Sequence, residues 1–158
     1  MEEKKKNILV VDDDKAILKY AKDVLQLEGY EVDVAETGFD ALEKSNTRYY
    51  NLALLDIKLP DIEGTELLNK IHKTTPTMKK IMITGFPSLD NAVEALNRGV
   101  DAYLLKPVEM EELLKVVKEK LKEQEEDEKT SEEQVTAWIT NRVQKLRVNN
   151  NAELRGHS

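Results

Sequence analysis

Residues Leu52 to Gly64 read LALLDIKLPDIEG, and this segment is the most informative about the fold of the chain. Its first four residues are all apolar, a pattern typical of a strand that is buried on both faces of a sheet. Pro60 and Gly64 then indicate the loop that follows the strand. Asp56 stands between strand and loop, where a carboxylate is partly removed from water. The sequence therefore predicts a buried strand with an acidic group held at its carboxyl end.

Four more short apolar runs occur along the chain, and segments with helical periodicity separate them. Such alternation predicts an α/β fold, in which helices cover both faces of a doubly wound parallel sheet. The predicted strands are Ile8–Val11, Glu31–Ala35, Leu52–Leu55, Lys80–Ile83 and Ala102–Leu105. A last helix, from Met110 to about Lys122, completes the predicted globular unit.

The composition excludes several classes of function. The 158-residue chain has a formal net charge of -7, which opposes direct binding to the phosphates of nucleic acids. It contains no cysteine and two histidines, so disulfides, thiol nucleophiles, cysteine-ligated zinc and histidine-rich metal sites are excluded. No apolar run reaches the roughly 18 residues that a membrane-spanning helix needs. We therefore expect a soluble cytoplasmic protein that uses oxygen ligands and does not bind membranes.

Unusual polar residues lie at the carboxyl ends of the predicted strands, and in a parallel sheet these ends share one edge. Carboxylates gathered there repel one another unless a cation joins them, and Mg2+ prefers such oxygen ligands. A bound cation beside a lysine and a hydroxyl group can hold and transfer phosphate. The residues at the strand ends are Asp12, Asp13, Asp14, Asp56, Thr84 and Lys106. Among them, Asp14 is also expected to cap the following helix.

Four motifs now carry a resemblance. ILVVDDD, LALLDIKLPDIEG, IMITG and AYLLKP occur in this order, and together they resemble the receiver domain of two-component response regulators. The resemblance extends from about Lys5 to Lys122, so residues 5–122 are interpreted as a receiver domain. It implies a flavodoxin-like sheet with the strand order 2-1-3-4-5. It also implies a phosphorelay protein that is not an enzyme for other substrates and catalyses only its own phosphorylation and dephosphorylation.

The resemblance implies a role for each residue of the predicted site. Asp56 is the phosphoacceptor, which takes a phosphoryl group from a phosphohistidine on a sensor histidine kinase. Asp13 binds Mg2+ directly, Asp12 acts largely through water, and the backbone carbonyl of Lys58 is a further ligand. Thr84 and Lys106 contact the oxygens of the phosphoryl group.

The resemblance also implies how the signal leaves the site. Tyr103 matches the aromatic residue that switches inward when Thr84 moves toward the phosphoryl group. The surface of the fourth helix, fifth strand and fifth helix then signals to a downstream effector protein or effector domain. The Lys106–Pro107 peptide bond is implied to be cis.

The composition changes after Lys122. Residues 123–134 contain seven acidic residues and one lysine, which indicates a solvated linker or a helical extension. Ser131 is interpreted as the cap of a separate helix, whose amphipathic part is residues 135–148, and a disordered tail is expected at 149–158. We expect this helix to dock on a partner or to pair with its copy in a homodimer. Both a stand-alone receiver and a truncated regulator are compatible with the sequence, and we favour the former.

Two other functions stay open at this point. The D-x-D pattern of Asp12 and Asp14, followed by Thr84 and Lys106, is also similar to phosphatases of the haloacid dehalogenase class. That class needs a further acidic pair after the lysine, and it leaves Asp56 without a role. A receiver-like binding module that never accepts phosphate is the second alternative.

Overall fold

The structure is a computed structural model that describes residues 5–74, 77–85 and 88–156 of the chain. The chain divides into two compact units, Met1–Gln124 and Glu125–Ser158. Within the part of the chain that the structure describes, no helix is both long and apolar enough to cross a membrane.

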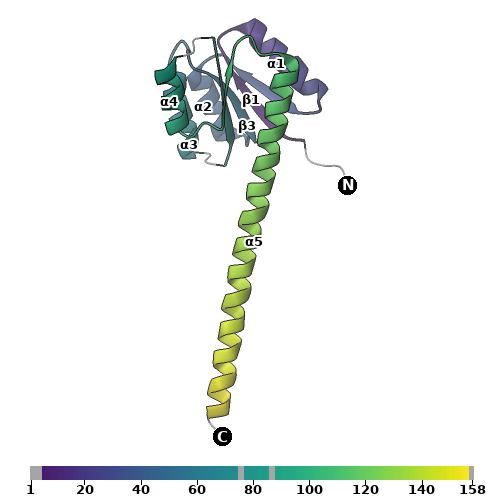
Figure 1. Cartoon of the computed structure of the whole chain (residues 1–158), viewed down its shortest axis with the longest axis vertical. Coiled ribbons are helices and arrows are strands. Elements are labelled where there is room, and N and C mark those ends of the chain that lie inside the picture. Colours follow the sequence, from purple (N-terminus) through teal and green to yellow (C-terminus); the bar gives the residue numbers. More distant parts are fainter. Residues whose placement is uncertain (1–4, 75–76, 86–87, 157–158) are drawn as a thin grey trace. The chain divides into compact units, whose positions relative to one another are not determined.

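The first unit contains a five-stranded sheet with the order β2-β1-β3-β4-β5 (Figure 1). All neighbouring strands run parallel, which confirms the predicted doubly wound fold and its strand order. The chain order reverses beside β1, and in such sheets the ligand crevice forms at this point. The strands are β1 (Asn7–Val11), β2 (Glu31–Ala35), β3 (Leu52–Asp56), β4 (Lys79–Thr84) and β5 (Ala102–Leu105).

Helices connect the strands and cover both faces of the sheet. They are α1 (Lys15–Leu27), α2 (Gly38–Thr47), α3 (Gly64–Thr74), α4 (Leu89–Asn97) and α5 (Met110–Gly156). Side chains alternate between the two faces of the sheet along each strand, so a separate apolar cluster forms on each face. In one cluster, α2, α3 and α4 pack against the sheet through Ala41, Leu67 and Ala95. In the other, α1 and the start of α5 pack against it through Leu25 and Val117.

Side chains cap the first two helices. The side chain of Asp14 accepts hydrogen bonds from the backbone amides of Ala16 and Ile17, which confirms its predicted role as the cap of α1. Thr37 caps α2 in the same way through the amide of Asp40. The turns that lead into these helices are therefore held in place beside the strand ends that precede them.

The prediction of a separate C-terminal helix was wrong about where that helix begins. No helix begins at Ser131, because α5 is continuous from Met110 to Gly156. Residues 123–134 are mostly Glu, Gln and Lys, which favour helix, and contain no Gly or Pro that would end one. The acidic stretch is therefore a helical extension, and the serine occupies an interior position of the helix.

Two boundaries also differ from the prediction. The compact first unit extends to Gln124, two residues beyond the predicted end, because the buried side chain of Gln124 is hydrogen-bonded to the carbonyl of Asn51, the residue before β3. The tail that was expected to be disordered from residue 149 is helical as far as Gly156, since no helix-breaking residue precedes that glycine. Residues 157–158 of that tail lie outside the described part of the chain.

Candidate functional site

The candidate site lies at the carboxyl edge of the sheet, where β1 and β3 end side by side. Val11 pairs with Leu55 in the parallel register, so the residues that follow them, Asp12 and Asp56, are also neighbours. Asp12 is 3% exposed and Asp56 is 4% exposed. Two carboxylates are thus held close to each other and largely out of water, as the strand-end pattern predicts.

A third carboxylate, from Asp13, completes what we call the acid cluster. Asp12, Asp13 and Asp56 each place one carboxylate oxygen within 4.8 Å of the others, and the Asp13 side chain is exposed. Carboxylates at this separation repel one another, and a divalent cation would offset that repulsion. An all-oxygen set with one side open to solvent fits Mg2+, which keeps several water ligands when it binds proteins.

Lys106 contacts two members of the acid cluster. Its Nζ atom lies 2.6 Å from Oδ2 of Asp12 and 3.1 Å from Oδ2 of Asp56. Burial alone would lower the pKa of Lys106, but hydrogen bonds and charge attraction from the two carboxylates outweigh burial and raise that pKa. The lysine therefore stays positively charged at neutral pH.

Backbone contacts hold Lys106 in this position. Its amide donates a hydrogen bond of 2.8 Å to the carbonyl of Thr84, which ties the end of β5 to the end of β4. The peptide bond between Lys106 and Pro107 is cis, as the resemblance implies. The lysine thus reaches the acid cluster from two strands away in the sheet.

Each buried carboxylate also has a second, backbone contact. Oδ1 of Asp12 accepts a hydrogen bond of 2.9 Å from the amide of Asp14. Oδ1 of Asp56 is 3.4 Å from the amide of Lys58, which is a long and weak contact. Oδ1 of Asp56 is therefore less firmly held than Oδ1 of Asp12. The structure places Lys58 directly beside Asp56, and the role of its carbonyl as a ligand stays a prediction.

The loop after Asp56 is closed by a glycine that admits no side chain. A Cβ atom on Gly64 would lie 2.2 Å from the carbonyl oxygen of Asp56, so any other residue would push the loop away from β3. The Gly64 amide also donates to the carbonyl of Ile57 at 2.6 Å. Gly64 therefore lets the loop fold back over the end of the strand that carries Asp56.

Sequence reasoning missed Asp61, which joins this loop to α2. Its two carboxylate oxygens accept hydrogen bonds from the amides of Gly38 and Phe39, at 2.8 and 2.9 Å. Desolvation would raise the pKa of Asp61, but these backbone hydrogen bonds lower it below its ordinary value. An acid between Pro60 and Gly64 was the only sequence signal for this contact, and acids are common in loops.

Thr84 and Tyr103 lie on the strands beyond β3. Thr84 is completely buried at the end of β4, one strand away from Asp56. Tyr103 pairs with Met82 and packs against the cluster beneath α3 and α4, so it lies outside the acid cluster. Its buried hydroxyl has no hydrogen-bond partner within the described residues, and burial raises its pKa.

The sheet is parallel, and clustered acids and a lysine lie at the edge where its strand order reverses. This arrangement defines a class of doubly wound proteins that bind a cation and an anion at this edge. The response regulator receiver domain family matches residues 8–118 of the chain. The chain therefore belongs to the receiver domain family of response regulators, and it is homologous to the regulators of two-component systems. This result overturns the haloacid dehalogenase alternative, and the central place of Asp56 in the acid cluster agrees with that.

Individual relatives support the same assignment. A receiver domain protein (CheY-like) from Methanospirillum hungatei JF-1 is 56% identical, with a TM-score of 0.78 over 78% of this chain and 99% of that chain. The transcriptional regulatory protein ZraR of Klebsiella oxytoca is 36% identical over 73% of this chain. The response regulator ArlR of Staphylococcus aureus is 36% identical over 74% of it. The matched region covers 26% of ZraR and 53% of ArlR, so the chain spans only part of these relatives.

Proposed function

We propose that the chain accepts a phosphoryl group on Asp56 from a histidine kinase, and that the phosphorylated form signals to a downstream partner. The observation that carries this proposal is the position of Asp56, which is buried within the acid cluster and lies 3.1 Å from Nζ of Lys106. The proposal also places the chain in the cytoplasm. Its catalysis is limited to its own phosphorylation and dephosphorylation.

Asp56 is the nucleophile in this reaction. A carboxylate oxygen forms a new bond to phosphorus while the bond from phosphorus to the histidine nitrogen of the donor breaks. The electron pair of the broken bond returns to the imidazole ring, which leaves as a neutral histidine. Among the described residues, Oδ1 of Asp56 accepts only the long contact from the Lys58 amide, so we infer that it is the oxygen that attacks.

The acid cluster would hold Mg2+ through the carboxylates of Asp12, Asp13 and Asp56 and the carbonyl of Lys58. When bound, the cation offsets the negative charge of the transferred group. Lys106 supplies a second positive charge, since its raised pKa keeps it protonated. We infer that it shifts from the Asp56 carboxylate to a phosphoryl oxygen, and that the hydroxyl of Thr84 donates to another.

An apolar hollow beside the site supports docking of a phosphodonor protein. It has a volume of about 500 Å3 and lies between α1 and the start of α5, next to Lys106 and Pro107. Ile17 and Tyr20 form its α1 side, and Tyr20 is 43% exposed. A helix of a sensor kinase that buries apolar side chains here would bring its phosphohistidine to the open side of the acid cluster.

Tyr103 is the proposed switch. Its buried hydroxyl lacks a partner among the described residues, and an unsatisfied buried hydroxyl costs about 1–3 kcal/mol. A movement of Thr84 toward the phosphoryl group would pull the end of β5 through the bond between its carbonyl and the Lys106 amide. Tyr103 can then change its packing, which alters the surface of α4, β5 and α5 that an effector would read.

Intact-mass measurement after incubation with acetyl phosphate and Mg2+ tests the proposal. The wild-type chain should gain the mass of one phosphoryl group, and Asp56→Asn should gain none. Asp23→Asn is the matched control, because Asp23 is an exposed acid on α1 outside the cluster, and it should be modified like wild type. No adduct on the wild-type chain, or an adduct that persists in Asp56→Asn, would instead support the binding module that never accepts phosphate.

A further inference from the structure

The second unit exposes a stripe of large apolar side chains along one helix. We call Val135, Trp138, Ile139, Val143 and Leu146 the C-terminal stripe. Their exposed fractions range from 41% for Val143 to 64% for Trp138. Their three- and four-residue spacing places them on one side of the helix. A row of exposed large apolar side chains marks an interaction surface, so we expect another surface to cover the stripe.

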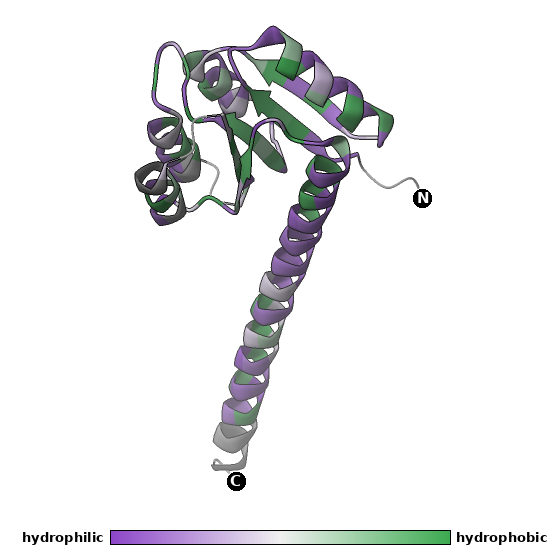
Figure 2. Cartoon of the chain, turned by 45° about the horizontal axis from the view of Figure 1, so that its top comes forward, coloured by the Kyte–Doolittle hydropathy of each residue, from purple (hydrophilic) through white to green (hydrophobic). Residues whose placement is uncertain are grey.

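Charges are segregated on either side of this stripe. Residues 125–134 contain six acidic residues and one lysine, whereas residues 135–150 contain three basic residues and no acid. Figure 2, which is coloured by hydropathy, shows that the helix is hydrophilic before the stripe and carries apolar bands along it. Glu132 and Glu133 precede the stripe, and Lys145 and Arg147 lie at its other end, all of them exposed.

Two copies of this charge pattern attract each other in only one relative orientation of the two helices. A parallel pair of such helices would set acid against acid and base against base, and like charges across a helix pair are destabilising. An antiparallel pair places the acids that immediately precede the stripe of each helix near Lys145 and Arg147 of the other. It is also isologous, so both copies use the same surface and the assembly closes as a dimer.

We propose that the C-terminal stripe is covered by a second copy of this chain, in a two-helix antiparallel dimer centred near Ile139. In this arrangement Val135 lies opposite Val143 of the second copy, and Glu132, which flanks the stripe, lies near Arg147 of the second copy. Trp138 is close to the two-fold axis, where the aromatic rings of the two copies contribute most of the buried area. Its ring already has the guanidinium of Arg142 5.9 Å from its centre.

The proposed dimer is independent of phosphotransfer, because none of its contacts involves the acid cluster. Its first test is the mass of the full chain in solution, measured by sedimentation over a range of concentrations without any phosphodonor. We expect a dimer that dissociates on dilution, and at least a tenfold weaker dimer for Val135→Asn. Val148→Asn is the matched control, since Val148 is 66% exposed and the helical period places it on the opposite side of the helix.

The second test measures orientation by disulfide crosslinking. The chain has no cysteine, so single-cysteine variants report one position each. Glu132→Cys mixed with Arg147→Cys should form a mixed disulfide after oxidation, and each variant alone should crosslink much less. A monomeric mass at every concentration, equal masses for wild type and Val135→Asn, or efficient crosslinking of each variant with itself would overturn the proposal.

Discussion

The two edges of the central sheet differ in how their polar groups are paired. At the carboxyl edge, three carboxylates lie within 4.8 Å of one another, and Lys106 contacts two of them. At the amino edge, partners are matched: the side-chain amide of Gln124 donates to the carbonyls of Asn51 and Thr77, both at 2.8 Å. The Asn51 side chain in turn accepts from the amide of Asn7 at 2.9 Å.

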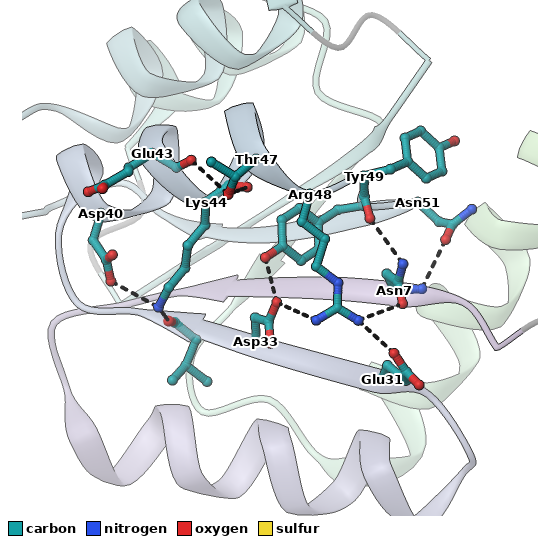
Figure 3. Close-up of polar contacts among 12 residues, drawn as sticks. Asn7, Glu31, Asp33, Asp40, Glu43, Lys44, Thr47, Arg48, Tyr49 and Asn51 are labelled. Carbon is teal, nitrogen blue, oxygen red and sulfur yellow. Dashed lines mark hydrogen bonds and ion pairs between the residues drawn. The ribbon is translucent and has the colours of Figure 1, made fainter.

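A network around Arg48 belongs to the same amino edge (Figure 3). The exposed side chain of Arg48 contacts Glu31 at 2.6 Å and Asp33 at 3.0 Å, and the hydroxyl of the buried Tyr50 donates to Asp33. Polar groups whose partners are complete stabilise one conformation, whereas a cluster of like charges raises the free energy of the folded state. The amino edge therefore serves stability, whereas the carboxyl edge retains an excess of negative charge that a divalent cation would balance.

Replacing Lys106 disrupts the ion pairs of the carboxyl edge and should give the largest loss of stability among these predictions. Lys106→Met leaves the buried carboxylates of Asp12 and Asp56 without their positive partner, which should lower the free energy of unfolding by about 3–5 kcal/mol. Urea denaturation with and without Mg2+ measures this loss, and the cation should restore part of it. Lys15→Met is the matched control, because its side chain is 82% exposed and 4.0 Å from Glu36, and it should change little.

Replacing Gln124 removes hydrogen bonds at the amino edge. Gln124→Ala leaves the carbonyls of Asn51 and Thr77 without this donor, so the free energy of unfolding should fall by about 1–3 kcal/mol. Mg2+ should give this variant the same gain in stability as wild type, because the acid cluster is intact. Gln134→Ala, an exposed position on the same helix, is the control. Equal stability of the two variants would show that the buried amide contributes nothing.

Binding of Mg2+ should stabilise the carboxyl edge and not the amino edge, and this gain in stability is smaller than the effects above. At ten times its dissociation constant, a cation that binds only the folded chain adds about 1.4 kcal/mol to stability. Thermal unfolding in MgCl2, compared with NaCl of equal ionic strength, should show this gain for wild type. Asp13→Asn should lose most of it, and it should be slightly more stable than wild type without the cation. An equal gain for both proteins would place the cation elsewhere.

Much of the carboxyl edge could be predicted from the sequence, because strand ends and loop residues are local signals. Uninterrupted apolar runs located β1 and β3, and the rule for parallel sheets placed Asp12, Asp56 and Lys106 along one edge. The strand order that makes β1 and β3 neighbours came from the family resemblance, and the direct contacts of Lys106 with Asp12 and Asp56 were not predicted. The roles of Lys58, Thr84 and Tyr103 as ligand, phosphate contact and switch stay predictions, since they depend on a bound cation or phosphoryl group.

The amino edge was not predicted, because its signals are not local. Gln124 lies in an acidic stretch and was interpreted as solvated, yet its partner Asn51 is 73 residues away in the chain. Lys80 begins a predicted strand like any surface lysine, yet it is 1% exposed and donates to the carbonyl of Met78 at 2.8 Å. Burial lowers the pKa of Lys80. Such polar groups become interior only when distant segments meet, which no periodicity reveals.

The smallest predicted effect concerns Tyr50 and its dependence on pH. Burial, followed by the hydrogen bond to Asp33 and the charge of Asp33, raises the pKa of Tyr50 far above its ordinary value of 10.0. Above pH 10 the unfolded chain therefore ionises at this residue while the folded chain does not. The contribution of Tyr50 to stability is complete below that pH and is lost as the pH rises toward the folded pKa.

Tyr50→Phe should be less stable than wild type by about 1 kcal/mol at pH 7, because it loses one hydrogen bond to Asp33. The difference should shrink between pH 9 and pH 11, since phenylalanine has no proton to lose in the unfolded chain. Urea denaturation across this range measures it, with Tyr49→Phe at the exposed neighbouring position as the control. A difference that stays constant with pH would mean that the hydroxyl of Tyr50 ionises equally in both states, and the amino edge would then be less tightly paired than its hydrogen bonds indicate.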